Sequence, residues 1–312
     1  MLIIQSIIVL AVALFVLVRG ADFFIAGASS IGRSLGMSSF AVGVLIVGMG
    51  TSLPELAASL AAAWSGATEI VIANAVGSNI TNILLVVGVL AFFGGPIMIK
   101  QKLIKTELPL FFIATVHFIA VIIDGTVDRL EAALLVATFG AYMWYVLVES
   151  KNGDIETIDG ADEKLTAFVL IKTVLGLLAI LAGAKYAVDM TVVLAAELLI
   201  PVGVVAIAAI AVGTSLPELV VSIQAIRAKR TEMAIGNIFG SNAFNMLMVV
   251  GLPGMFISLT ADAVVMQLGL GIMLAASLIL FISGLARQLM RWEGLMMLIF
   301  FAFFVSKLFT FI

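Results

Sequence analysis

Long, continuous apolar stretches are the feature that most limits what this chain can fold into. There are ten of them, and each has roughly the 20 residues that an α-helix needs to cross the hydrocarbon core of a bilayer. Strands are not favoured, because the hydrophobic residues run continuously and do not alternate with polar ones. The chain is 63% hydrophobic and 11% charged, which is too little charge to cover the surface of a soluble fold. We therefore expect an all-α membrane protein with ten transmembrane helices, at approximately 2–18, 39–63, 70–93, 107–123, 130–148, 165–188, 202–226, 233–257, 264–284 and 293–311.

The distribution of lysine and arginine predicts how these helices are oriented. The connections after the odd-numbered stretches hold 12 basic residues, and those after stretches 2, 4, 6 and 8 hold 2 if Lys185, near the end of stretch 6, is counted with the connection that follows. Basic residues are enriched in cytoplasmic loops. We therefore expect a multi-pass protein of the plasma membrane with both termini on the non-cytoplasmic side. The polar run 150–164 is expected to be a cytoplasmic linker.

An internal repeat divides the chain into two halves. Residues 50–88 and 213–251 align without a gap at an offset of 163, with 21 of 39 positions identical. The halves, 1–149 and 165–312, each hold five expected helices, so equivalent helices cross the membrane in opposite directions. Inverted repeats are typical of secondary transporters with an ion site near the midplane. Simple duplication in a structural membrane protein is the alternative, but it does not explain why costly polar positions are duplicated: Thr51/Thr214, Ser52/Ser215, Glu55/Glu218, Asn74/Asn237, Ser78/Ser241, Asn79/Asn242 and Asn82/Asn245.

Glu55 and Glu218 are the most informative of these pairs. Each is expected in the middle of a span, where a lone carboxylate is costly and normally faces a cavity or a partner. No lysine or arginine is expected at that depth, since the nearest one, Lys172, is expected close to a helix end. We interpret the two glutamates as ligands of a bound cation.

Helical spacing adds further oxygen ligands in each half. Thr51 and Ser52 lie four and three residues before Glu55 and so share its helix face, and Ser78 and Asn82 repeat the four-residue spacing on the next helix. Pro54 and Pro217 break the helix locally, and this break allows backbone carbonyls near Gly48 and Ala211 to turn inward. The set contains only oxygen, which favours a hard cation such as Ca²⁺ with its six to eight oxygen ligands. The second half supplies the equivalent residues Thr214, Ser215, Ser241 and Asn245.

The paired GTSLPE and GSNxxN segments resemble the alpha-1 and alpha-2 repeats of the sodium/calcium exchangers in the calcium:cation antiporter superfamily. The resemblance implies that Glu55 and Glu218 bridge Ca²⁺, with Thr51, Thr214 and the backbone near Gly48 and Ala211 adding oxygens. It also implies that the sodium sites are lined by Ser52, Ser78, Asn82, Ser215 and Ser241. Movement of spans 1 and 6 across the remaining bundle would give alternating access.

Asn245 departs from the pattern of this family, in which several members carry an aspartate at that position. With asparagine in both halves and both glutamates ionised, the site holds a charge of about −2, which one Ca²⁺, two Na⁺ or two H⁺ neutralise. A third Na⁺ would leave an uncompensated charge in a site of low dielectric constant, which is costly. The sequence therefore predicts exchange with fewer than three Na⁺, or with protons.

The leading hypothesis is an antiporter that exchanges Ca²⁺ for Na⁺ and functions as a monomer in the lipid bilayer. A Ca²⁺/H⁺ antiporter on the same scaffold and a cation channel remain alternatives, and only the inverted repeat argues against the channel. The chain contains no cysteine, phosphate-binding loop or nucleophile motif, so we expect neither an enzyme nor a resident cofactor. The expected ligands are transported ions, and no nucleic acid is expected as a partner.

Overall fold

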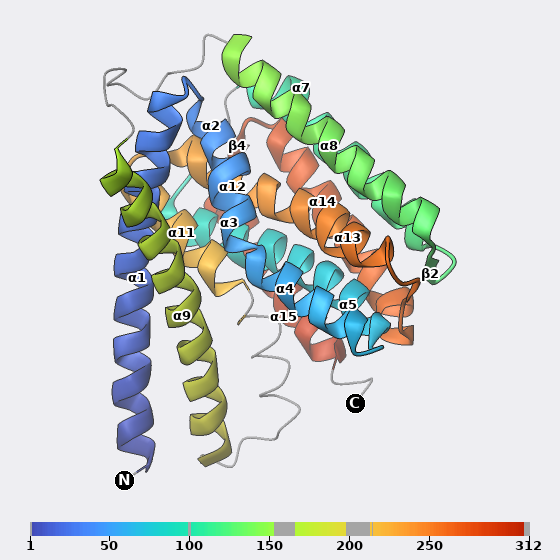
Figure 1. The fold of residues 1–312 in the computed structure, drawn as a ribbon, viewed down its shortest axis with the longest axis horizontal. Helices are drawn as coiled ribbons and strands as arrows, with labels where there is room; N and C mark the ends of the chain where they lie inside the picture. Colours follow the sequence, from blue (N-terminus) through green and yellow to red (C-terminus); the bar gives the residue numbers. More distant parts are fainter. Residues whose placement is uncertain (1, 99–100, 153–165, 198–212, 214, 309–312) are drawn as a thin grey trace.

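The computed structural model describes residues 2–98, 101–152, 166–197, 213 and 215–308, and most of them are helical (Figure 1). The first part of the chain forms α1 (Leu2–Ser34), α2 (Ser39–Val42), the π-helix η1 (Gly43–Gly48), α3 (Met49–Thr51), α4 (Leu53–Trp64), α5 (Thr68–Ile80), the π-helix η2 (Thr81–Val87), α6 (Gly88–Gly94), α7 (Gln101–Ile122) and α8 (Arg129–Asn152). The second part forms α9 (Ala167–Glu197), α11 (Leu216–Arg227), α12 (Thr231–Phe244), the π-helices η3 (Asn245–Val249) and η4 (Val265–Gly269), α13 (Val250–Gly254), α14 (Leu270–Leu285) and α15 (Arg291–Leu308).

Six helices of the described chain are long and apolar enough to cross a membrane. A seventh is added if Ser39–Thr51 and Leu53–Trp64, which are bent by 43° relative to each other, form one broken span. The chain is therefore a multi-span helical membrane protein. The expected total of ten spans stays a prediction, and residues 202–212 and 214 of the expected seventh span, 202–226, lie outside the described residues.

The expected end of the first span, at residue 18, is wrong. Helix α1 continues without a break to Ser34, so Arg19 and Asp22 lie within it and not in a connection. Their side chains are 57% and 42% exposed and 3.7 Å apart, and Arg19 also lies over the ring of Phe23. A charged residue on the outer face of a helix keeps its polar tip in solvent or at the headgroups and does not interrupt the backbone. Helix α9 likewise runs beyond the expected end at 188, to Glu197.

Helices α1 and α9 form a closely packed pair beside the rest of the molecule (Figure 1). Glycines allow their backbones to touch: a Cβ on Gly176 would lie 2.7 Å from the Phe24 nitrogen, and one on Gly183 would lie 2.8 Å from the Ala13 carbonyl oxygen. In a bilayer, helices associate through such small residues because lipid provides no hydrophobic driving force. Helices α1 and α9 therefore contact each other more extensively than they contact the other helices.

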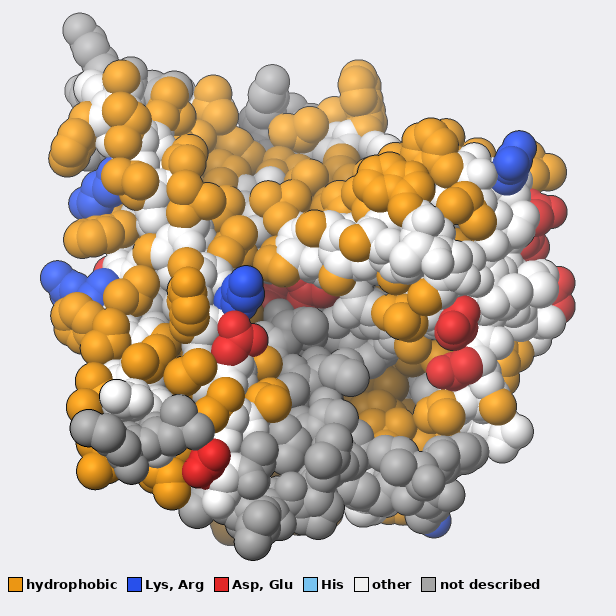
Figure 2. Space-filling view, turned by 60° about the horizontal axis from the view of Figure 1, so that its bottom comes forward, with side chains coloured by type: hydrophobic (Ala, Val, Ile, Leu, Met, Phe, Trp, Pro, Cys, Tyr) orange, Lys and Arg blue, Asp and Glu red, His pale blue; other side chains and the backbone are white. Residues whose placement is uncertain are grey.

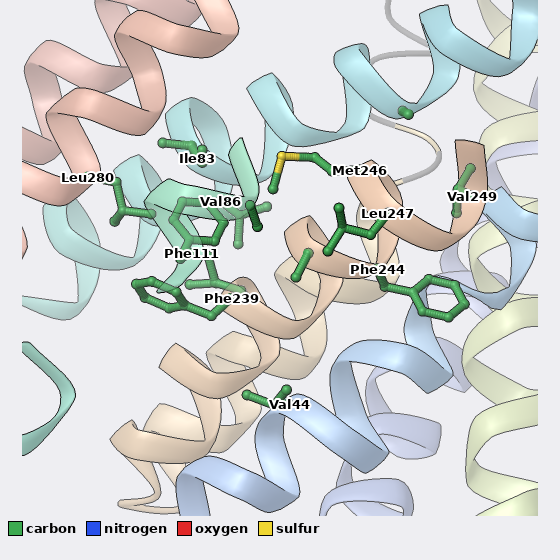
Figure 3. Packing of buried hydrophobic residues seen from close by; sticks show 14 of the residues in the cluster. Val44, Ile83, Val86, Phe111, Phe239, Phe244, Met246, Leu247, Val249 and Leu280 are labelled. Atoms are coloured by element: carbon green, nitrogen blue, oxygen red, sulfur yellow. The ribbon is translucent and has the colours of Figure 1, made fainter. Parts of the chain in front are cut away.

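Helix α12 forms the centre of the bundle, where every side chain from Met233 to Phe244 is buried. The ring of Phe239 packs edge-on against Phe111 of α7 with centroids 4.9 Å apart, and Phe244 packs against Phe139 of α8 at 5.6 Å. Figure 3 shows Phe111 and Phe239 within a cluster that also contains Val44 of η1 and Leu247 of η3. This apolar packing fixes α12 in the position from which it contributes to the polar site described below.

Glycines also bring α12 against η1. A Cβ on Gly48 would lie 2.8 Å from the backbone nitrogen of Ser241, and a Cβ on Gly240 would lie 2.7 Å from the Cα of Val44. Gly43 and Gly236 face each other in the same way. The first repeat segment therefore meets the second through backbone atoms, without side chains between them.

Two short antiparallel ladders join connections that are distant in sequence. Strand β1 (Ile97–Met98) pairs with β4 (Gln288–Leu289), and β2 (Thr126–Val127) pairs with β3 (Leu259–Thr260). The offset of 163 that relates the repeat segments converts the pair Ile97–Leu289 into the pair Thr260–Thr126. Each ladder is therefore the counterpart of the other.

The surface has the character expected for contact with lipid. On the face in Figure 2, hydrophobic side chains are widely spread and charged side chains occur in small, separate groups. Large apolar residues such as Phe15, Trp144 and Trp292 are at least 66% exposed. An exposed apolar surface of this extent fits a bilayer and not water.

Candidate cation-binding site

The first GTSLPE segment forms a broken helix, as its proline predicts, and in the second a helix starts at the equivalent position, after Ser215. Ser52 and Ser215 have nearly the same non-helical backbone conformation, with φ, ψ of −90°, 7° and −95°, 5°, and a new helix starts after each. Pro54 and Pro217 occupy the first turn of α4 and α11, where a missing N–H donor costs nothing. Glu55 and Glu218 follow in the same first turns, at the positive end of each helix dipole, which favours a carboxylate.

Both carboxylates are buried, with 1% of each residue exposed. Among the described residues, neither oxygen of Glu55 has a hydrogen-bond partner, and Glu218 has one, because the hydroxyl of Ser52 donates to its Oε1 over 3.1 Å. No described lysine or arginine pairs with either glutamate, and Lys172 instead lies over the ring of Phe23 at 5.1 Å. Among the described residues, no lysine therefore neutralises either buried glutamate.

The Gly48 carbonyl is a meeting point of the two repeats. Its oxygen accepts hydrogen bonds from the hydroxyls of Thr51 at 3.3 Å and Ser241 at 3.2 Å, and from the Ser52 amide at 3.2 Å. The predicted inward-facing carbonyl is thus at the site, but protein donors occupy it. The same Thr51 hydroxyl lies 3.3 Å from the Oδ1 of Asn237, so its single proton is shared between this oxygen and the Gly48 carbonyl.

Two asparagines hold the backbone of the glutamates. Asn74 donates to the Glu55 carbonyl at 3.1 Å and to the Ser59 hydroxyl at 3.0 Å. Asn237 makes the equivalent bonds, to the Glu218 carbonyl at 3.3 Å and to the Ser222 hydroxyl at 2.8 Å. The asparagines were recognised as duplicated but were not assigned to the site, and Ser59 and Ser222 were missed. Their identity at the offset of 163 is the signal that identifies them.

Further amides are buried without partners at the π-helices. Asn82 and Asn245 each have an unpaired Oδ1 and Nδ2, and both lie at the start of a π-helix, η2 or η3. Asn79 and Asn242 each donate back to their own helix over 2.7 Å and leave Oδ1 unpaired. π-Helical turns are frequent at functional sites because they reorient side chains.

The repeats cross at this site. Segment η3, with Asn245, packs against α4, with Glu55, while η2, with Asn82, packs against α11, with Glu218. Each half therefore places its amide beside the carboxylate helix of the other half. The contacts of the described residues are not symmetric, because the hydroxyl of Ser52 binds Glu218 whereas that of Ser215 has no partner among them.

The structure thus brings together most of the residues that the sequence analysis proposed. Hydrogen bonds link Thr51, Ser52, Glu218 and Ser241 directly or through Asn237. The carboxylate of Glu55 is buried but makes no hydrogen bond to a described residue, and Ser78 is buried on the helix that carries Asn82. Ala211 and Thr214 lie outside the described residues. The described part of the chain holds no cluster of three acidic, histidine or cysteine residues, so the site consists of carboxylates, amides, hydroxyls and a carbonyl.

This arrangement defines a helical membrane protein with a buried, oxygen-rich polar site inside its bundle, as a cation transporter requires. A buried pair of carboxylates, three of whose four oxygens lack a partner among the described residues, is costly unless a cation neutralises it. Comparison with known proteins gives the family. The family model described as sodium/calcium exchanger protein matches residues 5–148 and 168–310, and the chain belongs to this family.

Relatives and solved structures agree over nearly the full length. The sodium/calcium exchanger MaX1 of Methanosarcina acetivorans is 33% identical over 97% of this chain and 98% of its own. The putative antiporter CaxA of Alkalimonas amylolytica is 34% identical over 96% of this chain and 97% of its own. A structure of the sodium-calcium exchanger NCX_Mj superimposes with a TM-score of 0.85 and 29% identity, covering 98% of this chain and 99% of that chain. The protein is a transporter and not an enzyme.

Proposed function

We infer that the protein is a secondary antiporter that exchanges Ca²⁺ for Na⁺, and we propose that both ions bind between α4, α11, η2 and η3. The observation that carries this proposal is the pair Glu55 and Glu218, buried to 99% with three of their four oxygens unpaired. One Ca²⁺ matches their combined charge of about −2.

The surrounding ligands suit Ca²⁺ in number and kind. Besides the three carboxylate oxygens, the buried oxygens without partners include Oδ1 of Asn82, Oδ1 of Asn245 and the hydroxyl of Ser215. These make six, the lower limit of calcium coordination, and they are the hard oxygen donors that calcium prefers. Ca²⁺ and Na⁺ bind here as transported substrates, and no resident cofactor is needed.

The assignment of both glutamates is tested by ⁴⁵Ca²⁺ uptake into proteoliposomes under an outward Na⁺ gradient. Glu55→Gln and Glu218→Gln should each abolish uptake, because each removes one of the two charges that neutralise Ca²⁺. Glu69→Gln is the matched control, since Glu69 lies exposed at the start of α5 in the same repeat segment. Full uptake by both site variants would disprove the assignment.

The counter-ion follows from the two amides. Since Asn82 and Asn245 add no charge, the site balances two Na⁺ and leaves a third uncompensated, so we propose exchange with fewer than three Na⁺. Membership in the sodium/calcium exchanger family favours Na⁺ over H⁺. Uptake driven by a pH gradient without Na⁺ would instead indicate protons. Electrogenic transport with three Na⁺ per Ca²⁺ would contradict the charge argument, whereas Asn245→Asp should move the protein toward that ratio.

We further propose ten transmembrane helices in two inverted repeats, with alternating access by movement of α1 and α9 across the bundle. The offset of 163 supports the repeats, because it relates both the site residues and the two β-ladders. The few contacts of the α1–α9 pair with the other helices support its movement. A saturable flux at carrier rates is expected, and single-channel currents would favour a channel.

We propose that the protein works as a monomer in the plasma membrane, with both termini outside the cytoplasm. The chain has no cysteine, so a single cysteine introduced near either end provides a clean probe. It should react with an impermeant maleimide added outside intact cells.

A further inference from the structure

The turn between α11 and α12 has the same backbone as the turn between α4 and α5. Lys229 and Gly66, which are 163 positions apart, both have positive φ, of 59° and 83°. The next amide closes each turn: Arg230 N donates to the Ala225 carbonyl at 2.8 Å, and Ala67 N donates to the Ala62 carbonyl at 3.0 Å. Arg230 and Ala67 therefore occupy equivalent places, and they differ in their side chains.

The Arg230 side chain binds α1, which the proposed function assigns to the moving pair. Its Nη1 donates to the Ile25 carbonyl over 3.0 Å and to the hydroxyl of Ser29. Ser29 in turn donates to the Ile25 carbonyl over 2.7 Å, and both residues are at most 2% exposed. The guanidinium is thus fixed on a buried stretch of α1 and is not simply solvated.

Placing the charged Arg230 side chain against α1 costs free energy. Burial and the neighbouring positive charge of Arg33 both lower the pKa of Arg230. An arginine without a structural role would extend into water, where neither effect operates. The bonds to α1 offset this cost, and charge-assisted bonds of this kind are the stronger ones in proteins.

The other repeat has no such contact. Offset by 163, Ile25 and Ser29 of α1 correspond to Val188 and Val192 of α9, so the hydroxyl acceptor of Ser29 has no equivalent on Val192. The correspondence is anchored by Gly20 and Gly183, which both lie at the crossing of α1 and α9. Ala67 also has no side chain that could reach α9. One end of the transport pathway therefore has a polar tie to the moving pair that the other end lacks.

We propose that Arg230 is a positioning residue that holds α1 against the α11–α12 turn and so favours the conformation in which that end of the pathway is closed. The proposal rests on the proposed alternating access. A contact made in only one of two conformations shifts their populations by its own free energy. For one partly buried, charge-assisted contact we expect a shift of about tenfold, or about 1.4 kcal/mol.

Spin-label distances in nanodiscs test the proposal on the full chain. One label pair, at Leu35→Cys and Ala228→Cys, reports the Arg230 end, and a second, at Val192→Cys and Ser65→Cys, reports the opposite end. Arg230→Ala should increase the long-distance population of the first pair about tenfold and decrease it for the second pair. This opposite response is one that mere loosening of the structure would not produce.

Three variants complete the test. Arg230→Lys should give an intermediate shift, because an ammonium keeps the charge but lacks the planar fork of donors. Arg227→Ala should change neither distribution, since Arg227 is exposed in the last turn of α11. If Arg230→Ala does not fold, Ser29→Ala removes the hydroxyl alone and should shift the first pair in the same direction by a smaller factor.

Unchanged distributions in Arg230→Ala, or in Ser29→Ala if only that variant folds, would overturn the proposal. Parallel shifts at both ends would also overturn it. ⁴⁵Ca²⁺ exchange by the same unlabelled preparations separates this result from the function itself. A wild-type protein without exchange refutes the transporter, whereas exchange with unshifted distances refutes only the role of Arg230.

Discussion

Adding one methyl group at Gly240 should separate the two repeat segments, whereas the same change at the equivalent Gly77 should be tolerated. A Cβ on Gly240 would lie 2.7 Å from both the Cα and the carbonyl oxygen of Val44, and these backbone atoms cannot rotate away. At Gly77, no described atom lies within 4 Å of the added Cβ. To reach an ordinary contact of about 3.4 Å, α12 and η1 must move apart by about 0.7 Å at Gly240.

The cost of the close contact is the difference in folding stability between Gly240→Ala and Gly77→Ala. Alanine favours a helix over glycine by about 1 kcal/mol, and this gain is the same at both positions. Overpacking a well-filled interior costs about 1–3 kcal/mol, and this cost applies only at Gly240. Gly240→Ala should therefore be about 1–3 kcal/mol less stable than Gly77→Ala.

The same displacement should weaken the site. The hydrogen bond from Ser241 to the Gly48 carbonyl, now 3.2 Å, would lengthen to about 3.9 Å, beyond hydrogen-bond range. Thermal unfolding of the purified variants, measured side by side with and without Ca²⁺, should show a lower midpoint and a smaller Ca²⁺-dependent increase for Gly240→Ala. Equal midpoints and equal Ca²⁺ responses in the two variants would refute the reasoning that backbone contact at Gly240 positions the site.

Two further predictions use the same comparison between repeats. Ser52→Ala removes a donor to the buried Glu218 carboxylate and should cost about 1.5–3 kcal/mol of stability in the absence of bound ions. Ser215→Ala should cost less, because the Ser215 hydroxyl has no partner among the described residues. Equal unfolding midpoints for the two variants would contradict this. Asn237→Ala removes three hydrogen bonds at a fully buried position and should lower stability by about 2–4 kcal/mol. Asn74→Ala should cost less, because it removes two bonds at a less buried position. Chemical unfolding in detergent measures both, and an equal or larger loss at Asn74 would count against the assigned network.

The sequence alone correctly identified the break in the first GTSLPE helix, and the helix start after Ser215 in the second segment agrees with the same reasoning. Proline removes a backbone donor wherever it occurs, so the consequence of Pro54 and Pro217 is local and needs no knowledge of neighbouring helices. It also identified the buried glutamates as residues without a basic partner. By contrast, the end of the first span was misjudged at Arg19, because whether a charged side chain interrupts a helix depends on the face it occupies.

Several members of the site were accessible from the repeat but were not assigned to it. Ser59 and Ser222 are identical in the two segments, yet a buried serine looks the same in sequence whether it fills space or receives an asparagine bond. Only the packing of α4 on α5, and of α11 on α12, shows that each serine lies beside an asparagine. The same packing shows that Asn74 and Asn237, which the sequence presents only as duplicated polar residues, donate hydrogen bonds to the backbone carbonyls of the two glutamates.

The sequence by itself determined that the chain lies in a membrane, that it contains an internal repeat, and that the proposed ion ligands are oxygen atoms. Hydropathy, self-similarity and side-chain type are properties of the chain and need no knowledge of how it packs. Tertiary structure alone decided which repeat contacts which: η3 lies against α4, η2 lies against α11, and the Gly48 carbonyl meets Ser241. It also decided that the two halves are not equivalent, since Ser52 binds Glu218 while Ser215 is unpaired, and Arg230 holds α1 while Ala67 holds nothing. The physical reason is that a repeat encodes equal local structure, whereas contacts between halves depend on the particular conformation in which they pack.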